Sequence, residues 1–229
     1  MTMIARQLQD VRARIATACR AAGRAPDAVA LLAVSKTFGA DAVRAAHAAG
    51  QNAFGENYIQ EAVDKIDALR DLPLQWHCIG PIQSNKTRLV AERYDWAHSL
   101  DRLKIAERLS AQRPDGLTPL QVCLQVNIDG GPTKSGVAPA EALALARAVA
   151  ALPRLKLRGL MTIPEPAPDF DAALAVHRRA RALFDELNAE GLALDTLSMG
   201  MSADLEAAIA AGSTLVRIGT AIFGSRVPK

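Results

Sequence analysis

The 229-residue sequence is poor in aromatic residues (4%) and contains three cysteines, Cys19, Cys78 and Cys123. This odd number and wide spacing argue against a disulfide framework, and the spacing does not fit a metal site. Cys78 and Cys123 lie in apolar runs, where cysteine usually acts as a small core residue. We therefore expect a protein of a reducing cytoplasm.

Long apolar runs and blocks of like charge are also missing. No apolar run approaches the roughly 20 residues of a membrane-spanning helix, and the N-terminal stretch lacks the hydrophobic core of a secretory signal. The 27 basic and 24 acidic residues are interspersed and give a net charge of +3. This pattern argues against a membrane or nucleic-acid partner and favours a small anionic ligand.

The common nucleotide-binding motifs are absent as well. Residues 130–136, GGPTKSG, end like a Walker A loop, but Thr133 stands where that motif needs glycine. No GxGxxG sequence follows an expected strand. His77 is the one residue that suggests a lone metal ligand, and we interpret it as a core or rim histidine.

What the sequence does contain is a regular alternation of short apolar runs and helical stretches. Eight strands are predicted, at residues 29–35, 52–54, 74–80, 95–99, 119–128, 155–163, 194–200 and 214–219. Strands that alternate with helices indicate a parallel sheet with helical crossovers. Eight of them favour a closed (β/α)8 TIM barrel over an open doubly wound sheet. We expect one domain over residues 1–229.

One helix stands before this alternation. Ile4, Leu8, Val11 and Ile15 form the apolar face of an amphipathic helix that ends before Gly23. We expect it to cap one end of the barrel or to pack outside it. Further helices are predicted at residues 138–152 and 169–191.

In a barrel of this kind the functional site lies at the carboxyl ends of the strands. Lys36 directly follows the first strand there. Lysine in such a place is either a side chain reaching to solvent or an amine in a partly desolvated pocket, where it forms a Schiff base with an aldehyde. Lys36 alone does not decide between the two.

The last two strand ends carry the chemistry of a phosphate site. Residues 198–208, SMGMSADLEAA, and 217–224, RIGTAIFG, follow the seventh and eighth strands, whose loops often bind phosphate in barrels. Gly200 and Gly219 permit close backbone approach. Ser202 and Thr220 offer hydroxyl groups, and each is expected to open a short helix whose amides face an anion. The alternative for Ser202 is ordinary helix capping.

Arg217 interrupts the last apolar strand. Its side chain points either toward the helices or into the barrel mouth, and in both places it needs an acceptor. A carboxylate is one candidate acceptor, and a heteroaromatic ring nitrogen is another. A lysine for an aldehyde, a phosphate site and an arginine for a pyridine nitrogen together describe a site for pyridoxal 5′-phosphate.

Seven stretches of the sequence resemble the pyridoxal phosphate homeostasis proteins, a family related to the barrel domain of alanine racemase. They run in order along nearly the whole chain: AVSKTF (33–38), FGENYIQEA (54–62), WHCIGPIQSNK (76–86), KSG (134–136), RGLMTI (158–163), SMGMSADLEAAIAAGST (198–214) and VRIGTAIFG (216–224). The resemblance implies the fold-type III barrel of pyridoxal-phosphate-dependent proteins, with an extra N-terminal helix and without the C-terminal β domain of the racemases.

The resemblance also implies roles for individual residues. Lys36 would form the internal aldimine, and Arg217 would face the pyridine nitrogen. The remaining positions implied to bind the cofactor are Asn57, Met199, Gly200, Met201, Ser202, Gly219 and Thr220, with Met201 acting through its backbone and Met199 and Gly200 lining the pocket. Lys134 resembles a residue proposed in such proteins as a secondary cofactor contact or exchange site.

Two functions on this barrel remain to be compared. The first is a cofactor carrier that buffers or delivers pyridoxal phosphate, with apoenzymes as candidate recipients. The second is an amino-acid racemase or decarboxylase. An arginine donates to the ring nitrogen without protonating it, and the second acid/base domain of the racemases is not expected here. Both points favour a monomeric, non-catalytic carrier, and a purely structural protein would leave Arg217 unexplained.

Overall fold

Eight parallel strands close into a barrel in which each strand pairs with its neighbours in sequence order and β8 pairs with β1. This computed structural model describes residues 2–131 and 135–224. The strands are β1 (Ala30–Val34), β2 (Ala53–Glu56), β3 (Gln75–Cys78), β4 (Trp96–Leu100), β5 (Leu120–Gln125), β6 (Leu155–Met161), β7 (Thr196–Ser198) and β8 (Leu215–Ile218). The predicted (β/α)8 barrel is therefore confirmed.

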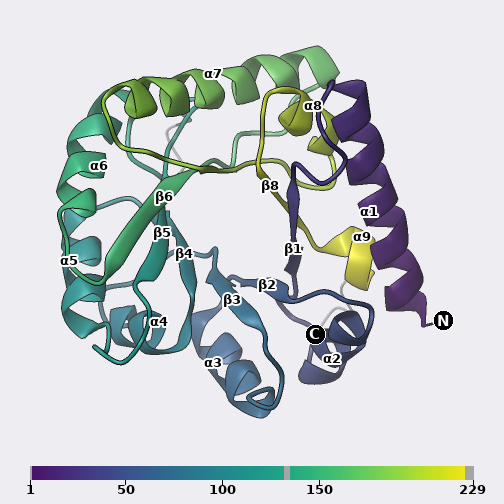
Figure 1. Cartoon of the computed structure of the whole chain (residues 1–229), viewed down its shortest axis with the longest axis horizontal. Helices are drawn as coiled ribbons and strands as arrows, with labels where there is room; N and C mark the ends of the chain where they lie inside the picture. The colour runs from purple at the N-terminus through teal and green to yellow at the C-terminus, as the bar shows by residue number, and fades with distance from the viewer. Residues whose placement is uncertain (1, 132–134, 225–229) are drawn as a thin grey trace.

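Helices surround the barrel on its outside (Figure 1). They are α1 (Met3–Ala21), α2 (Ala40–Ala48), α3 (Ile59–Ala68), α4 (Thr87–Arg93), α5 (Leu103–Gln112), α6 (Ala142–Ala150), α7 (Phe170–Ala189), α8 (Leu205–Ala210) and α9 (Thr220–Phe223), with a short 3-10 helix η1 at Pro139–Glu141. The helix predicted at residues 138–152 is thus two elements, η1 and α6.

The extra helix α1 packs outside the barrel, against α2, α8 and α9. Its buried residues include Leu8, Val11 and Ile15, three of the four residues of the predicted apolar face. Arg14 adds a bidentate contact with Glu206 of α8, with N···O distances of 2.6 and 2.7 Å. Of the two placements expected from the sequence, the structure shows the outer one.

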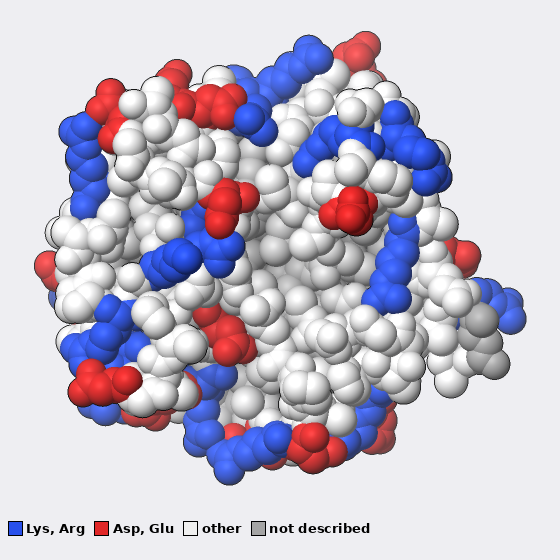
Figure 2. All heavy atoms as spheres, in the orientation of Figure 1, with Lys and Arg blue, Asp and Glu red and all other residues white. Residues whose placement is uncertain are grey.

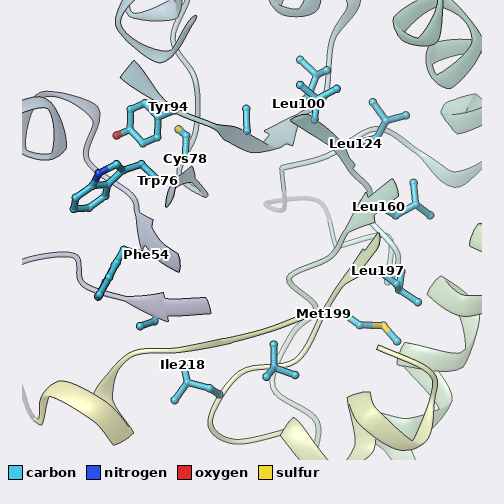
Figure 3. Close-up of a cluster of buried hydrophobic side chains, with 14 of the residues drawn as sticks. Phe54, Trp76, Cys78, Tyr94, Leu100, Leu124, Leu160, Leu197, Met199 and Ile218 are labelled. Atoms are coloured by element: carbon cyan, nitrogen blue, oxygen red, sulfur yellow. The ribbon is translucent and has the colours of Figure 1, made fainter. Parts of the chain in front are cut away.

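Side chains alternate between the two faces of the sheet, as the pleat of each strand requires. The outward-facing residues form one large apolar layer beneath the helices (Figure 3), with Phe54, Cys78, Leu124, Leu160 and Leu197 fully buried. Burying one leucine of this kind stabilises the fold by about 1.5–3 kcal/mol. This layer holds the helices on the barrel, and Cys78 acts in it as the small core residue that we predicted.

The inward-facing residues form separate, smaller groups. Leu32, Val34, Ile79 and Leu215 make one apolar cluster. Cys123 packs with Trp96 and Met161 in another. Burial raises the pKa of the Cys123 thiol to about 12, so it stays protonated and acts as a core residue.

Charges of both signs are interspersed over the face of the molecule shown in Figure 2, around a hollow centre lined mainly by uncharged residues. None of the helices in the described part of the chain is long and apolar enough to cross a membrane. The even mixture of charges agrees with the absence of a single-sign patch in the sequence.

Candidate functional site

Lys36 and Asn57 follow the carboxyl ends of the neighbouring strands β1 and β2. Val34 pairs with Gly55 in this part of the sheet. Lys36 and Asn57 each come two residues later, at the start of the loops that follow the two strands. Lys36 is half-buried. The side-chain oxygen Oδ1 of Asn57 is buried without a hydrogen-bond partner, so this mouth of the barrel holds a polar atom suited to a ligand.

A buried ion pair holds the backbone immediately before Lys36. The ammonium group of Lys65, on α3, donates to Glu56 Oε1 at 2.6 Å and to the carbonyl oxygen of Ser35 at 2.9 Å. The Ser35 hydroxyl donates to the same carboxylate oxygen at 2.6 Å. Burial raises the pKa of Glu56, and the charge and hydrogen bond of Lys65 oppose that rise. Residue 35 is therefore fixed through both its backbone and its side chain.

The backbone immediately after Lys36 is also held. The Thr37 N–H donates to Glu61 Oε1 at 2.9 Å. Thr37 has a φ of 69°, a left-handed conformation that is uncommon for a β-branched residue. Because strain of this kind persists only where the surroundings impose it, the two anchors together fix the direction in which Lys36 leaves the strand.

Two glycines shape the mouth beside β1, where they follow β7 and β8. Gly200 has a φ of 96°, and a Cβ atom there would lie 2.5 Å from the Cβ of Ala208. At Gly219 a Cβ atom would lie 3.1 Å from the carbonyl oxygen of Val34. Gly219 directly precedes α9, whose first residue is Thr220, as the sequence predicted. Both positions thus have physical reasons to be glycine.

The loop after β7 differs in part from the expectation. Helix α8 begins at Leu205, so Ser202 does not open it, and residues 202–204 form a turn. The Met201 N–H donates to Asp204 Oδ1 at 2.7 Å. A phosphate contact from the Met201 backbone would require that bond to break. Asp204 also accepts from His177 Nε2 at 2.9 Å, which anchors the turn to α7.

Met199 was expected to line the pocket, and the structure contradicts this for its side chain. Ser198 faces inward, so its neighbour Met199 faces outward into the apolar layer, close to Leu197 (Figure 3). Its N–H donates to the Leu215 carbonyl, and its own carbonyl accepts from Ser213. The period of two along β7 explains the error, because adjacent residues of a strand cannot both face the mouth.

Arg217 faces the barrel interior and is 4% exposed. Its acceptors are neutral: Nη1 donates to the Ser198 carbonyl and hydroxyl at 2.7 and 2.8 Å, and Nη2 donates to the Thr162 carbonyl at 2.8 Å. These contacts use at most three of the five N–H groups of a guanidinium. Burial lowers the pKa of Arg217 to about 10, still well above neutrality, so the buried cation has donors left for a ligand.

His77 is the core histidine that the sequence indicated, with 2% of its surface exposed and both ring nitrogens in hydrogen-bonding distance of neighbours. No cluster of three or more metal-binding side chains occurs among residues 2–131 and 135–224. The roles of Glu56, Lys65 and His98 were not predicted from the sequence. For His98 a signal existed, since it follows Trp96 by two residues and therefore shares its inward row. Lys134 lies outside the described residues.

Comparison with known proteins identifies the family. The family described as "Alanine racemase, N-terminal domain" matches residues 7–227. The Pseudomonas aeruginosa pyridoxal phosphate homeostasis protein is 62% identical over 226 residues, covering 99% of this chain and 97% of that protein. The Escherichia coli protein of the same name is 54% identical over 229 residues, with 99% and 98% coverage. The chain belongs to the pyridoxal phosphate homeostasis protein family.

Solved structures agree with this family membership. The structure of PipY from Synechococcus elongatus with pyridoxal phosphate bound is 40% identical, with a TM-score of 0.85 over 96% of this chain and 100% of PipY. The structure of PipY without the cofactor is 41% identical, with a TM-score of 0.86 over 96% of this chain and 100% of PipY. Alanine racemase from Corynebacterium glutamicum is 22% identical, with a TM-score of 0.66, and shares the fold over 99% of this chain and 62% of the racemase. The resemblance to the homeostasis protein family, predicted from seven motifs, is confirmed.

Proposed function

We propose that this protein binds pyridoxal 5′-phosphate at the barrel mouth, held covalently by the amine of Lys36, and that it buffers or delivers the cofactor within the cell. The family relatives are named for pyridoxal phosphate homeostasis, and one solved relative has the cofactor bound. The observation that carries the proposal is that a half-buried lysine, Lys36, and the buried, unpartnered Oδ1 of Asn57 follow the carboxyl ends of two paired strands, β1 and β2.

The residues at the mouth match the three polar parts of the cofactor. A half-buried lysine suits its aldehyde, because partial desolvation favours the neutral, nucleophilic amine. The remaining N–H donors of Arg217 suit the pyridine nitrogen, which is an acceptor. The tight, glycine-containing turns at Gly200 and Gly219, with the hydroxyls of Ser202 and Thr220, suit the phosphate. The cofactor, when bound, supplies an electrophilic aldehyde and an electron-withdrawing ring.

Within this proposal the protein is a monomeric carrier, and apoenzymes that use pyridoxal phosphate are the candidate recipients. A charged arginine does not protonate the pyridine nitrogen, so the ring withdraws electrons less strongly than it would beside a carboxylate. Arg217 thus favours binding of the cofactor over its activation.

Borohydride reduction followed by peptide mass analysis tests the attachment site. We expect the pyridoxyl mass on the peptide that contains Lys36 and its complete loss in a Lys36→Ala variant. Lys104 is the matched control, because it lies on the surface of α5, and a Lys104→Ala variant should be labelled like the wild type. Label on another lysine, with Lys36 unmodified, would overturn the proposal.

A further inference from the structure

A continuous row of hydrogen bonds crosses the inside of the barrel beneath Arg217. Gln75 Oε1 lies 3.0 Å from His77 Nε2, and His77 Nδ1 lies 2.9 Å from His98 Nε2. His98 Nδ1 lies 3.0 Å from the Ser198 hydroxyl, which accepts from Arg217 at 2.8 Å. The row joins four strands, β3, β4, β7 and β8, and ends on the guanidinium at the candidate site.

Both histidines of this row are neutral. His98 is fully buried and His77 is 2% exposed. Burial lowers the pKa of His77 to about 3. Burial, with the nearby His77 and Arg217, also places the pKa of His98 well below its ordinary value. A neutral imidazole has one N–H donor and one acceptor nitrogen, so each ring gives one hydrogen bond and receives one.

The Gln75 end of the row determines its direction, because a side-chain amide oxygen only accepts. His77 therefore donates through Nε2 to Gln75 and accepts at Nδ1 from His98. His98 in turn accepts at Nδ1, and the donor there is the Ser198 hydroxyl. With its hydrogen directed to His98, the Ser198 oxygen presents its lone pairs to Arg217.

Two other uses of these residues fit less well. A serine beside a histidine is the arrangement of a hydrolytic nucleophile, but Ser198 and His98 are both fully buried in the barrel interior, where a substrate has no access. Two histidines also suggest a metal, but among the described residues no third ligand accompanies them. A role in holding the guanidinium of Arg217, which donates to the Ser198 hydroxyl at the end of the row, explains these residues better.

We propose that His98 is a positioning residue for Arg217: through the Ser198 hydroxyl it fixes the guanidinium in the orientation that meets the pyridine nitrogen of the bound cofactor. This inference rests on the proposed function, because it assigns that contact to Arg217. The other acceptors of Arg217 are backbone carbonyls of Ser198 and Thr162. The hydroxyl is therefore the contact that a side-chain substitution can remove.

The experiment compares two probes, pyridoxal 5′-phosphate and its analogue with C–H in place of the ring nitrogen. Dissociation constants are measured for the wild type and for three variants. His98→Phe fills the space but offers no acceptor to Ser198, whereas His98→Asn restores one. Leu124→Ala removes apolar volume from the outer layer and controls for general loss of stability.

We expect the wild type and His98→Asn to prefer the natural cofactor over the analogue. His98→Phe should bind the cofactor about 10-fold more weakly, as for loss of one hydrogen bond to a charged group, while its affinity for the analogue stays unchanged. Leu124→Ala should keep the preference of the wild type. If His98→Phe does not fold, Ser198→Ala provides the same comparison from the other side of the contact.

Equal weakening for both probes in His98→Phe, or an unchanged preference, would overturn the positioning role. If the wild type itself binds neither probe at Lys36, the proposed function fails instead, and the two failures are distinguishable. Nitrogen-15 spectra of the histidine rings without cofactor provide an independent readout. We expect neutral His77 and His98, both protonated at Nε2, and protonation of His98 at Nδ1 would contradict the direction of the row.

Discussion

At the scale of single residues, the position of Lys36 depends on its neighbours. Ser35 is fixed by Glu56 and Lys65, and Thr37 is held by Glu61 in a left-handed conformation. A flexible lysine side chain loses about 2 kcal/mol of rotamer entropy when it is ordered. Because the backbone is fixed on both sides of Lys36, the amine has fewer positions available before a ligand binds. This lowers the entropic cost of ordering the side chain on binding.

Asp204 allows a prediction at the same scale. Burial raises the pKa of its carboxyl, but hydrogen bonds from His177 and from the Met201 N–H outweigh burial and leave the pKa below its ordinary value. The carboxylate therefore stabilises the fold above the unfolded pKa of about 4. That contribution is lost as the pH falls through the lower folded value.

We expect Asp204→Asn to lower the free energy of unfolding by about 1–2 kcal/mol at pH 7, and by progressively less below about pH 4. Urea unfolding at pH 7 and near pH 3 measures the difference. Asp185→Asn is the control, since Asp185 pairs with Arg181 on the surface of α7 and is 55% exposed. The free energy of unfolding of Asp185→Asn should fall by less than about 1 kcal/mol. An equal loss for Asp204→Asn at both pH values would contradict the assigned role.

At the scale of elements, the buried pair Glu56–Lys65 ties α3 to β1 and β2. The side chains are 0% and 4% exposed. Removing one partner of a buried ion pair leaves the other charge without compensation, and this typically costs about 3–5 kcal/mol. Replacing both partners removes the penalty, since no unpaired charge remains.

Lys65→Met should therefore lower the free energy of unfolding by about 3 kcal/mol or more, and adding Glu56→Gln should recover much of that loss. Urea unfolding of the two single variants and the double variant gives the coupling energy. Additive losses, with no recovery in the double variant, would show that the pair does not act as a unit. Lys104→Met on the surface of α5 is the matched control and should change stability little.

Local pattern was sufficient to predict the strands. All eight are present, and their starts and most of their ends lie within about two residues of the prediction. The largest difference is the end of β5, which stops at Gln125; beyond it Val126 forms a bridge with Val137, and the Asn127 N–H donates to the Val137 carbonyl. Apolar alternation and flanking turn residues are local signals, and they determine strands without knowledge of the neighbours.

The candidate site was predictable only in part. Lys36 and Arg217 could be singled out from the sequence because polar residues at apolar strand ends stand out, whereas Asn57 was implied by the family resemblance. The contact between His98 and Ser198 was not predictable, since 100 residues separate them and the contact depends on the register between strands. Lys65 was missed for a different reason, because a lysine on a helix usually faces water.

At the scale of the whole molecule, the barrel accounts for nearly the full length of the family relatives but for 62% of an alanine racemase. A two-base racemase needs a second acid or base opposite the lysine. The sequence has two tyrosines. Tyr94 is 1% exposed and lies in the outer apolar layer (Figure 3), where burial raises the pKa of its phenol. It cannot reach the barrel mouth from there.

Tyr58 is the other tyrosine, and it is the candidate for the second base that an enzyme would need. It follows Asn57, directly precedes α3 and is 53% exposed, so its phenol lies largely in water. With the loaded protein and each L-amino acid in turn, we expect racemisation and keto-acid formation to be slower than the turnover of an ordinary enzyme by about 1000-fold or more. Chiral chromatography measures the first and a coupled dehydrogenase the second.

A Tyr58→Phe variant sharpens the comparison, because it keeps the ring and removes the hydroxyl. Residual turnover that is equal in Tyr58→Phe and the wild type would come from the cofactor and Lys36 alone, which agrees with a carrier. Turnover at enzyme-like rates that Tyr58→Phe abolishes would overturn the carrier proposal and identify Tyr58 as the second base. Cofactor affinity measured in parallel must stay unchanged in Tyr58→Phe, so that a loss of turnover is not a loss of binding.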